Sequence, residues 1–320
     1  DKRLDHYEEV LRLMESKPSV ELSSHSSITV ASQIVGSGMS VPERIVTNDY
    51  FASYLETNDA WIRERTGIQE RRWAEPGVGV GVFAEAAARN ALKDAELEPS
   101  DIDGIVLATV TPDYVFPSSA CVLQGRLGIK RGFAFDINAV CSGFIYSLVT
   151  ADSLIASGQC RNVLVVGAEL FSRIINPNDR STCVLFGDGA GAVVLSRVGE
   201  GEMSASRNGT RIGVTGSSSS LRGIYLSELC SDGQYGDILC VPSGTANPPT
   251  AETFATAEHL LKMNGREVFK LAVRNLVDIS ERLLQRAGFT AQDVDFFISH
   301  QANKRILKSM GEHLGVPESK

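Results

Sequence analysis

The chain has 320 residues, 43% of them hydrophobic and 22% charged, with a formal net charge of −8 at pH 7. This composition suits a soluble globular protein with a sizeable core, and its acidic balance argues against a general nucleic-acid binder. No apolar run approaches the ~18 residues that cross a bilayer, so we expect neither a nucleic acid nor a membrane as a partner.

Cysteine usage and the N-terminus bear on the compartment. The six cysteines show no Cys-x-x-Cys pair and no zinc-like spacing, and the first residues lack the apolar core of a secretory signal. We therefore expect reduced thiols, no metal site and a cytoplasmic protein. Residues 1–27 are predicted to be an N-terminal extension with a linker, which could be a tag remnant, a partner-binding helix or part of a transit sequence.

From residue 28 onward, strand and helix patterns alternate. Strand character is found at 28–38, 105–110, 133–140, 162–169 and 186–196, and helical spacing at 83–95, 121–127, 145–155 and 265–287. The alternation indicates the α/β class, with a mostly parallel sheet covered by helices on both faces. Residues 200–250 are predicted to be rich in loops, with a flexible excursion at 217–220.

Trp61 lies between the first strand and the first long helix, with Arg63 and Arg65 beside it. An exposed tryptophan among arginines could stack on a flat anionic ligand and clamp it. An ordinary core residue is the commoner explanation of an isolated tryptophan.

Cys141 stands where a buried strand passes into a helix. Unpaired backbone N–H groups and the positive end of the helix dipole favour a thiolate at such a place, and a thiolate is the nucleophilic form. We therefore expect a candidate for covalent acyl transfer. The alternative, a small buried hydrophobe, has about equal weight on this segment alone.

A short internal repeat suggests two copies of one α/β unit. Residues 92–103 and 284–295 each combine a helix end with an Asp-[Ile/Val]-Asp turn, and each is followed by an apolar segment. The second apolar segment, 296–298, is predicted to be a buried strand that ends at His300. Because open α/β sheets place ligands at strand ends, we expect His300 to be the imidazole partner of Cys141.

Several motifs are specific when taken together. They are Asn58-Asp-Ala-Trp61-Ile-x-x-Arg65, Phe116-Pro-Ser, Ala139-Val-Cys141-Ser-Gly-Phe, Asp179-Arg180-Ser-Thr, Phe186-Gly-Asp-Gly-Ala-Gly-Ala, Asn264-Gly265-Arg-Glu-Val-Phe269-Lys and Ser299-His300-Gln-Ala-Asn303. From about residue 28 to the C-terminus the sequence resembles the β-ketoacyl-acyl carrier protein synthase III family, the thiolase-fold enzymes that start fatty acid synthesis.

The resemblance implies a fold and a reaction. The expected fold has two duplicated α/β halves in α-β-α-β-α layers, the first at 28–200 with Cys141 and the second at 201–320 with His300. The expected reaction condenses a short acyl-coenzyme A with malonyl-acyl carrier protein through an acyl-cysteine, with release of carbon dioxide. Coenzyme A enters as a thioester substrate, and no tightly bound cofactor is expected.

The resemblance also implies roles for single residues. Trp61 and Arg180 would hold the adenine ring of coenzyme A, with Arg65 near its phosphates. Gly265, Phe269 and Asn303 would line the pantetheine arm. Phe116 would reach across a homodimer into the partner's acyl pocket.

Basic residues on two helices suggest where an acidic carrier protein could dock. Lys270 and Arg274 lie one helical turn apart, as do Lys304 and Lys308, with Arg305 alongside. A solvated helix face is the alternative explanation of such lysines.

One part of the family pattern is missing from the 320 residues. The resemblance implies a Cys-His-Asn triad whose asparagine lies in a Gly-Asn-Thr-Ser segment beyond the histidine helix, and this sequence ends at Pro317-Glu-Ser-Lys320 without it. We therefore expect either a second half truncated at the C-terminus or a chain unable to perform the whole reaction. Two further possibilities remain open: a sibling enzyme that acylates another acceptor, and a non-catalytic subunit that binds acyl groups or carrier protein.

Overall fold

The structure is a computed structural model that describes residues 28–198, 204–208, 211–214 and 222–320. The predicted extension at 1–27 and the predicted loop at 217–220 lie outside the described residues.

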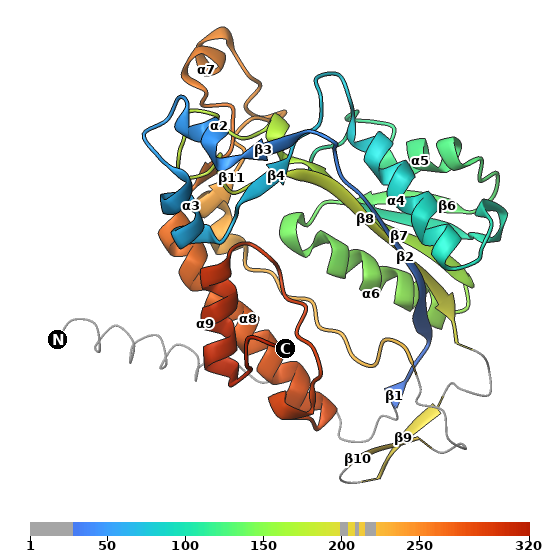
Figure 1. Cartoon of the computed structure of the whole chain (residues 1–320). Coiled ribbons are helices and arrows are strands. Elements are labelled where there is room, and N and C mark those ends of the chain that lie inside the picture. Colours follow the sequence, from blue (N-terminus) through green and yellow to red (C-terminus); the bar gives the residue numbers. More distant parts are fainter. Residues whose placement is uncertain (1–27, 199–203, 209–210, 215–221) are drawn as a thin grey trace.

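A five-stranded sheet forms the centre of the molecule (Figure 1). Its strands, in spatial order, are β2 (Ser32–Ser40), β8 (Asp188–Arg197), β7 (Asn162–Leu170), β5 (Gly104–Ala108) and β6 (Phe133–Ile137). β5 runs parallel to β6 and β7, whereas β8 is antiparallel to both β7 and β2. The sheet is therefore mixed: four of its five strands run in one direction, as the prediction of a mostly parallel sheet requires, and β8 alone runs against them. The chain passes from β7 to β8 without a crossover α-helix, so β8 returns in the opposite direction.

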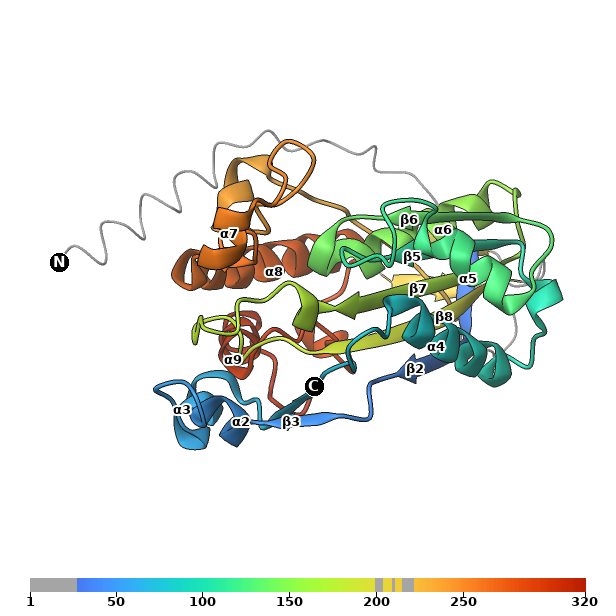
Figure 2. The same cartoon turned by 90° about the horizontal axis from the view of Figure 1, so that it is seen from above.

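Helices cover both faces of this sheet, as the two views show (Figures 1 and 2). α4 (Val80–Asp94) and α5 (Ser119–Leu127) pack on one face, and α6 (Gly143–Ala156) packs on the other. Alternate residues of β5 serve the two cores, because successive side chains of a strand point to opposite faces. Leu107 belongs to the cluster under α4 and α5, and Val106 belongs to the cluster under α6. The α/β class is thus confirmed.

Two glycines let α4 approach β2 closely. A Cβ atom at Gly36 would lie 2.4 Å from the backbone nitrogen of Ala95, and one at Gly38 would lie 2.4 Å from the carbonyl oxygen of Ala87. Because α4 presents mainly alanine to the sheet, the backbones of helix and strand meet with little side chain between them.

A smaller unit lies beyond one end of the sheet. β3 (Ile45–Thr47) and β4 (Glu70–Arg72) form an antiparallel pair that flanks α2 (Asn48–Ala52) and α3 (Asp59–Thr66). Its core combines residues of this unit with residues of the loop between β7 and β8. They are Val46, Phe51, Ile62, Trp73, Ile175, Cys183 and Val184.

The remaining described elements lie in the C-terminal third and at the N-terminal edge. α8 (Gly265–Ala287) packs beside α9 (Lys304–Leu314), and α7 (Ala251–Thr256) lies apart from them (Figure 1). Two small sheets complete the set: β11 (Leu239–Cys240) with β12 (Lys262–Met263), and β1 (Ile28–Thr29) with β9 (Ser204–Asn208) and β10 (Arg211–Val214). In the described residues, no helix is both long and apolar enough to span a membrane.

The two turns of the internal repeat are confirmed, but the strand after the second turn is not. Both copies contain a 3₁₀ turn with a capping box, at Pro99–Asp101 and at Ala291–Asp293. β5 follows the first turn, but no strand follows the second, where Phe296 is 72% exposed and Ile298 is 91% exposed. The predicted strand at 296–298 is therefore wrong, because no neighbouring strand among the described residues pairs with its backbone. The division into duplicated halves at residue 200 stays a prediction.

Candidate active site

Cys141 lies in a tight turn between β6 and α6. A 3₁₀ turn at Val140–Ser142 follows β6, and α6 begins at Gly143. Val140 has a φ of +47°, a left-handed conformation that is strained for a β-branched residue and typical of functional sites. Gly143 sits against Ala108 of β5, where a Cβ atom would lie 2.9 Å from the alanine Cβ. The predicted place of Cys141, at a strand end and a helix start, is confirmed.

Glu169 lies at the same end of the sheet and had no predicted role. In the register of the parallel strands, Ala108 faces both Ile137 of β6 and Gly167 of β7, so the ends of all three strands lie together. The Glu169 carboxylate accepts hydrogen bonds from the Val110 backbone nitrogen (2.9 Å) and the Thr111 hydroxyl (2.7 Å). The sequence feature that could have pointed to Glu169 is a single acidic residue near the end of the apolar segment that forms β7.

The electrostatic setting of Cys141 differs from the prediction. Burial raises the pKa of the Cys141 thiol, a backbone hydrogen bond lowers it, and the nearby Glu169 carboxylate raises it further. The residue remains accessible to solvent, so the desolvation comes from the protein around and beneath the thiol. The expected stabilisation of a thiolate by the start of α6 is therefore outweighed, and the neutral thiol is favoured at rest. Burial also raises the pKa of Glu169, against the effect of its hydrogen bonds.

His300 lies in the strandless segment that precedes α9. The residue is exposed at its surface, but the protein packed around the ring desolvates it and lowers the pKa of its imidazole, so the neutral ring is favoured at neutral pH and can donate one N–H. Asn303, three residues later, caps α9 by accepting a hydrogen bond from the Ile306 backbone nitrogen (3.0 Å). In the part of the chain that the structure describes, no hydrogen bond joins His300 to Cys141.

Trp61, Arg65 and Arg180 lie together in the structure. Asn58 caps α3 through the Trp61 backbone nitrogen (2.8 Å), which fixes the start of this helix. The guanidinium carbons of Arg65 and Arg180 lie 4.5 Å and 4.7 Å from the centre of the Trp61 ring. Arg180 also donates a hydrogen bond to the carbonyl oxygen of Glu56. A flat ligand that enters between Trp61 and Arg180 has to displace this guanidinium group.

The predicted channel and docking residues lie on α8 and α9. Gly265 is the first residue of α8, and Phe269 faces α9, with the Arg305 guanidinium carbon 5.7 Å from its ring centre. Lys270 pairs with Glu267 at 3.0 Å.

The other basic residues spread along the same two helices. Lys308 pairs with Glu312 at 3.8 Å, and Arg274 donates to the Asn275 side chain at 3.4 Å. The Lys304 side chain lies close to Gly67, at the end of α3. Lys270, Lys304, Arg305 and Lys308 are exposed, whereas Arg274 is half-buried. Four of the five predicted basic residues are therefore exposed on these two helices.

Phe116 lies in the loop between β5 and α5. It is 83% exposed and follows Tyr114 and Val115, which are exposed as well. Within the described chain this aromatic residue thus protrudes without a packing partner of comparable size.

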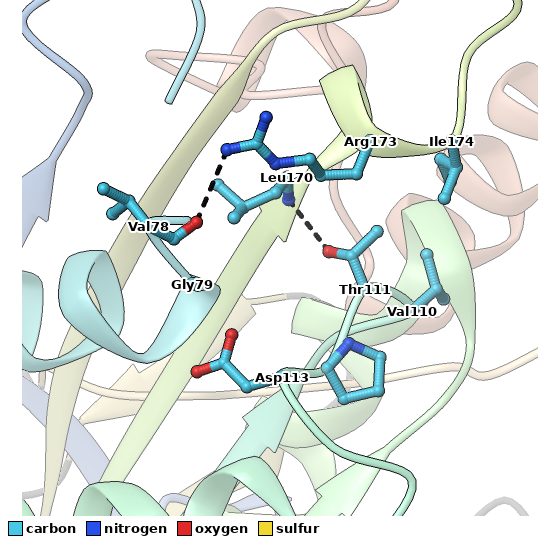
Figure 3. Close-up of a pocket in the computed structure, with 9 residues that line it drawn as sticks. Val78, Gly79, Val110, Thr111, Asp113, Leu170, Arg173 and Ile174 are labelled. Carbon is cyan, nitrogen blue, oxygen red and sulfur yellow. Dashed lines mark hydrogen bonds between the residues drawn. The ribbon is translucent and has the colours of Figure 1, made fainter. Parts of the chain in front are cut away.

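A cavity of about 320 Å³ opens beside Val110 and Thr111, the two residues that donate hydrogen bonds to Glu169 (Figure 3). It is lined by Val78, Gly79, Val110, Thr111, Pro112, Asp113, Leu170, Arg173 and Ile174. Both of its charged residues are hydrogen-bonded to backbone groups beside the cavity, including the bond from Arg173 to Val78 drawn in Figure 3. Arg173 donates to the carbonyl oxygen of Glu75 (2.6 Å), and Asp113 accepts from the backbone nitrogens at the start of α4. Among the described residues, no three His, Cys, Asp or Glu side chains are grouped to hold a metal ion.

Comparison with known proteins places this site in a family. A family model described as 3-oxoacyl-(acyl-carrier-protein) synthase III matches residues 135–211, and the model of its C-terminal region matches residues 284–320. The β-ketoacyl-(acyl-carrier-protein) synthase III of Cereibacter sphaeroides is 46% identical over 290 residues, which is 91% of this chain and 83% of that protein.

Solved structures agree with the sequence comparison. The crystal structure of 3-oxoacyl-(acyl-carrier-protein) synthase III from Aquifex aeolicus has a TM-score of 0.74 at 38% identity, covering 90% of this chain and 82% of that one. The priming β-ketosynthase of the R1128 polyketide biosynthetic pathway has a TM-score of 0.74 at 30% identity, covering 94% of this chain and 82% of that one.

The mixed α/β architecture, with a cysteine at the start of a sheet-covering helix, defines the class: a condensing enzyme of the thiolase fold. The relatives identify the branch of this class. The chain belongs to the β-ketoacyl-acyl-carrier-protein synthase III family, as its motifs predicted.

Proposed function

We propose that this chain is an acyltransferase that condenses a short acyl-coenzyme A, such as acetyl-coenzyme A, with malonyl-acyl carrier protein to initiate fatty acid synthesis. The observation that carries the proposal is the accessible Cys141 thiol in the turn before α6, within the family's cysteine motif. The 46% identity to a β-ketoacyl-acyl-carrier-protein synthase III supports it.

The first half-reaction transfers the acyl group. The Cys141 sulfur attacks the thioester carbonyl, a new carbon–sulfur bond forms, and the bond to the coenzyme A sulfur breaks. The thiol proton leaves with coenzyme A, so acyl-Cys141 and free coenzyme A result. Because the resting thiol is neutral, the proton has to depart as the sulfur attacks.

The second half-reaction forms the new carbon–carbon bond. The malonyl group loses carbon dioxide, the resulting enolate attacks the acyl-Cys141 carbonyl, and the cysteine sulfur leaves. The product is 3-oxoacyl-acyl carrier protein. Neutral His300 donates an N–H to the thioester oxygen, where negative charge develops during decarboxylation.

Coenzyme A is a substrate in this scheme. Trp61, Arg65 and Arg180 would form the clamp for its nucleotide, since they already lie in contact. Gly265, Phe269 and Asn303, at the starts of α8 and α9, would line the pantetheine arm. The exposed basic surface of Lys270, Lys304, Arg305 and Lys308, with Arg274 beside it, would receive the acidic carrier protein.

A homodimer suits the exposed edge of the sheet. Among the described strands β6 is the last in the sheet order, and all its residues are half-buried. Its outer backbone groups, apart from the Ala134 carbonyl oxygen that accepts from the Cys121 Sγ (3.4 Å), could pair with a second copy. Phe116 protrudes nearby in sequence and would reach the partner's acyl pocket.

A reducing compartment such as the cytoplasm suits a nucleophile that must remain a free thiol.

A sibling reaction with another acyl acceptor is the second candidate. The 30% identity to a priming β-ketosynthase of a polyketide pathway favours it. It shares the first half-reaction, and the two candidates differ in the identity of the acceptor.

Product analysis with and without His300 tests the proposal. With acetyl-coenzyme A and malonyl-acyl carrier protein, the chain should release carbon dioxide and form 3-oxoacyl-acyl carrier protein. His300→Ala should slow carbon dioxide release by about 10²–10³, the usual effect of one lost oxyanion donor, while Cys141 still becomes acylated. Acylation without any 3-oxoacyl product would favour the sibling reaction, and the absence of both would contradict the proposal.

A further inference from the structure

Arg71 of β4 is buried, although arginine is rarely found inside a protein. It is 6% exposed, and its hydrogen bonds go to uncharged oxygen atoms rather than to a carboxylate. Its guanidinium group lies 4.7 Å from the centre of the Phe51 ring, and its Nε has no hydrogen-bond partner. Burying such a group is costly, and burial lowers its pKa to about 10, so its position calls for an explanation.

The acceptors of Arg71 lie on two different parts of the chain. One guanidinium nitrogen donates to the carbonyl oxygen of Val46 (3.0 Å). The other donates to the Asn48 side-chain oxygen (2.9 Å) and to the carbonyl oxygen of Val184 (2.8 Å). Val184 lies four residues after Arg180, in the loop between β7 and β8. Arg71 therefore links the unit that carries Trp61 to the loop that carries Arg180.

Asn48 extends the link to α3. Its side-chain nitrogen donates to the Asp59 carboxylate (2.8 Å) and to the carbonyl oxygen of Ile68 (2.9 Å), which lie at the start and just past the end of α3. Trp61 is the third residue of this helix. A continuous path of hydrogen bonds thus runs from Val184 through Arg71 and Asn48 to α3.

The Arg180 end of this path is ordered locally. The Asp179 carboxylate accepts hydrogen bonds from the Ser181 backbone nitrogen (2.9 Å) and from the Thr182 hydroxyl (2.8 Å). Cys183 and Val184 then enter the same apolar cluster as Phe51 and Ile62. Arg71 is the charged connection inside this shared cluster, beside a neutral one from the Trp73 indole to the carbonyl oxygen of Phe186 (3.2 Å).

We propose that Arg71 is a positioning residue that holds Trp61 and Arg180 at the spacing needed to clamp the nucleotide of an acyl-coenzyme A. The proposal rests on the proposed function, because it assumes that these two side chains bind coenzyme A. Arg71 is buried away from solvent and acts through the two segments it joins. Its loss should therefore affect substrates with a nucleotide and spare those without one.

Arg71→Lys keeps the positive charge but cannot reach three acceptors in the planar geometry of a guanidinium group. We expect this variant to raise KM for acetyl-coenzyme A by about tenfold, the loss that corresponds to one weakened charged hydrogen bond. The rate of Cys141 acylation by acetyl-N-acetylcysteamine, which lacks the nucleotide, should change less than twofold, and so should kcat with saturating acetyl-coenzyme A.

Two further variants make the test decisive. Asn48→Ala breaks the same path from its other side and should give the same selective effect, which keeps the test valid if Arg71→Lys does not fold. Arg72→Lys is the matched control, because Arg72 is the next residue of β4 but is half-exposed. Its contacts are long: 3.4 Å and 3.3 Å to carbonyl oxygens and 3.8 Å to the Glu70 carboxylate. This variant should leave both substrates unaffected. Thermal unfolding of each variant identifies a general loss of structure.

The outcomes separate this inference from the proposed function. If Trp61→Ala raises KM for acetyl-coenzyme A but Arg71→Lys and Asn48→Ala do not, the clamp exists and the role of Arg71 is refuted. If the two thioesters lose activity equally in the Arg71 and Asn48 variants, Arg71 supports the fold in general and the inference is also refuted. If Trp61→Ala has no effect either, the clamp itself is wrong.

Discussion

Glu169 and Cys141 form an unusual pair at the scale of single residues, because a carboxylate lies near a thiol that has to act as a nucleophile. The thiol pKa is raised by burial first and by Glu169 second. The thiolate is therefore scarce at neutral pH, and the rate of Cys141 alkylation should keep rising with pH through the ordinary thiol range. An alkylation rate that levels off near pH 7 would contradict this description of the site.

Glu169→Gln removes the negative charge and keeps one oxygen that can accept from the Val110 backbone nitrogen, while its amide nitrogen can donate to the Thr111 hydroxyl in place of the bond that this hydroxyl now donates. The thiol pKa should fall, so alkylation of Cys141 at pH 7 should become several-fold faster and its pH profile should move to lower pH. The rate should be followed on the Cys141 peptide, since Cys121 and Cys230 are exposed too. Glu252→Gln, on α7, serves as the control. An unchanged profile in both variants would show that Glu169 only supports the local fold.

Predictions for single residues succeeded where the structure is set locally in the sequence. The place of Cys141 between a strand and the start of α6 is an example. The direction of the Cys141 pKa shift was not predictable, because it depends on the protein packed around the thiol and on Glu169, 28 positions away in the sequence.

At the scale of elements, the exposed basic surface on α8 and α9 yields a prediction. Lys304→Glu combined with Arg305→Glu should weaken binding of malonyl-acyl carrier protein by at least tenfold at low salt, with a smaller effect at high salt. Binding of acyl-coenzyme A should be retained. Lys93→Glu, an exposed charge reversal on α4, is the matched control and should leave carrier binding unchanged. Equal binding by the double variant and the unaltered chain would exclude this surface as the docking site.

Most elements were predictable because their apolar spacing is strong. The segments of β5 and β7 are short continuous apolar runs, and those of α4 and α8 show helical spacing. Local patterns could predict neither the direction of β8 nor the absence of a strand at residues 296–298. Both depend on which strands lie next to them, a property of the assembled sheet.

At the scale of the whole molecule, the exposed loop at Phe116 and the open edge of β6 favour assembly with a second copy. Phe116→Asp places a charge where the dimer is expected to be apolar and should shift the chain toward monomer in analytical ultracentrifugation at micromolar concentration. Phe254→Asp is the control, because Phe254 on α7 is also strongly exposed but far from β6 in the fold (Figure 1). An identical distribution of dimer and monomer for the Phe116 variant and the unaltered chain would exclude Phe116 from the interface.

The central claim is that Cys141 carries the acyl group, and intact mass spectrometry tests it most directly. The chain should be incubated with acetyl-coenzyme A, desalted at acidic pH and weighed beside Cys141→Ala treated in the same way. We predict a gain of one acetyl group in the unaltered chain, none in Cys141→Ala, and assignment of the modified peptide to Cys141. No gain in mass, or an equal gain in the Cys141→Ala variant, would contradict the account.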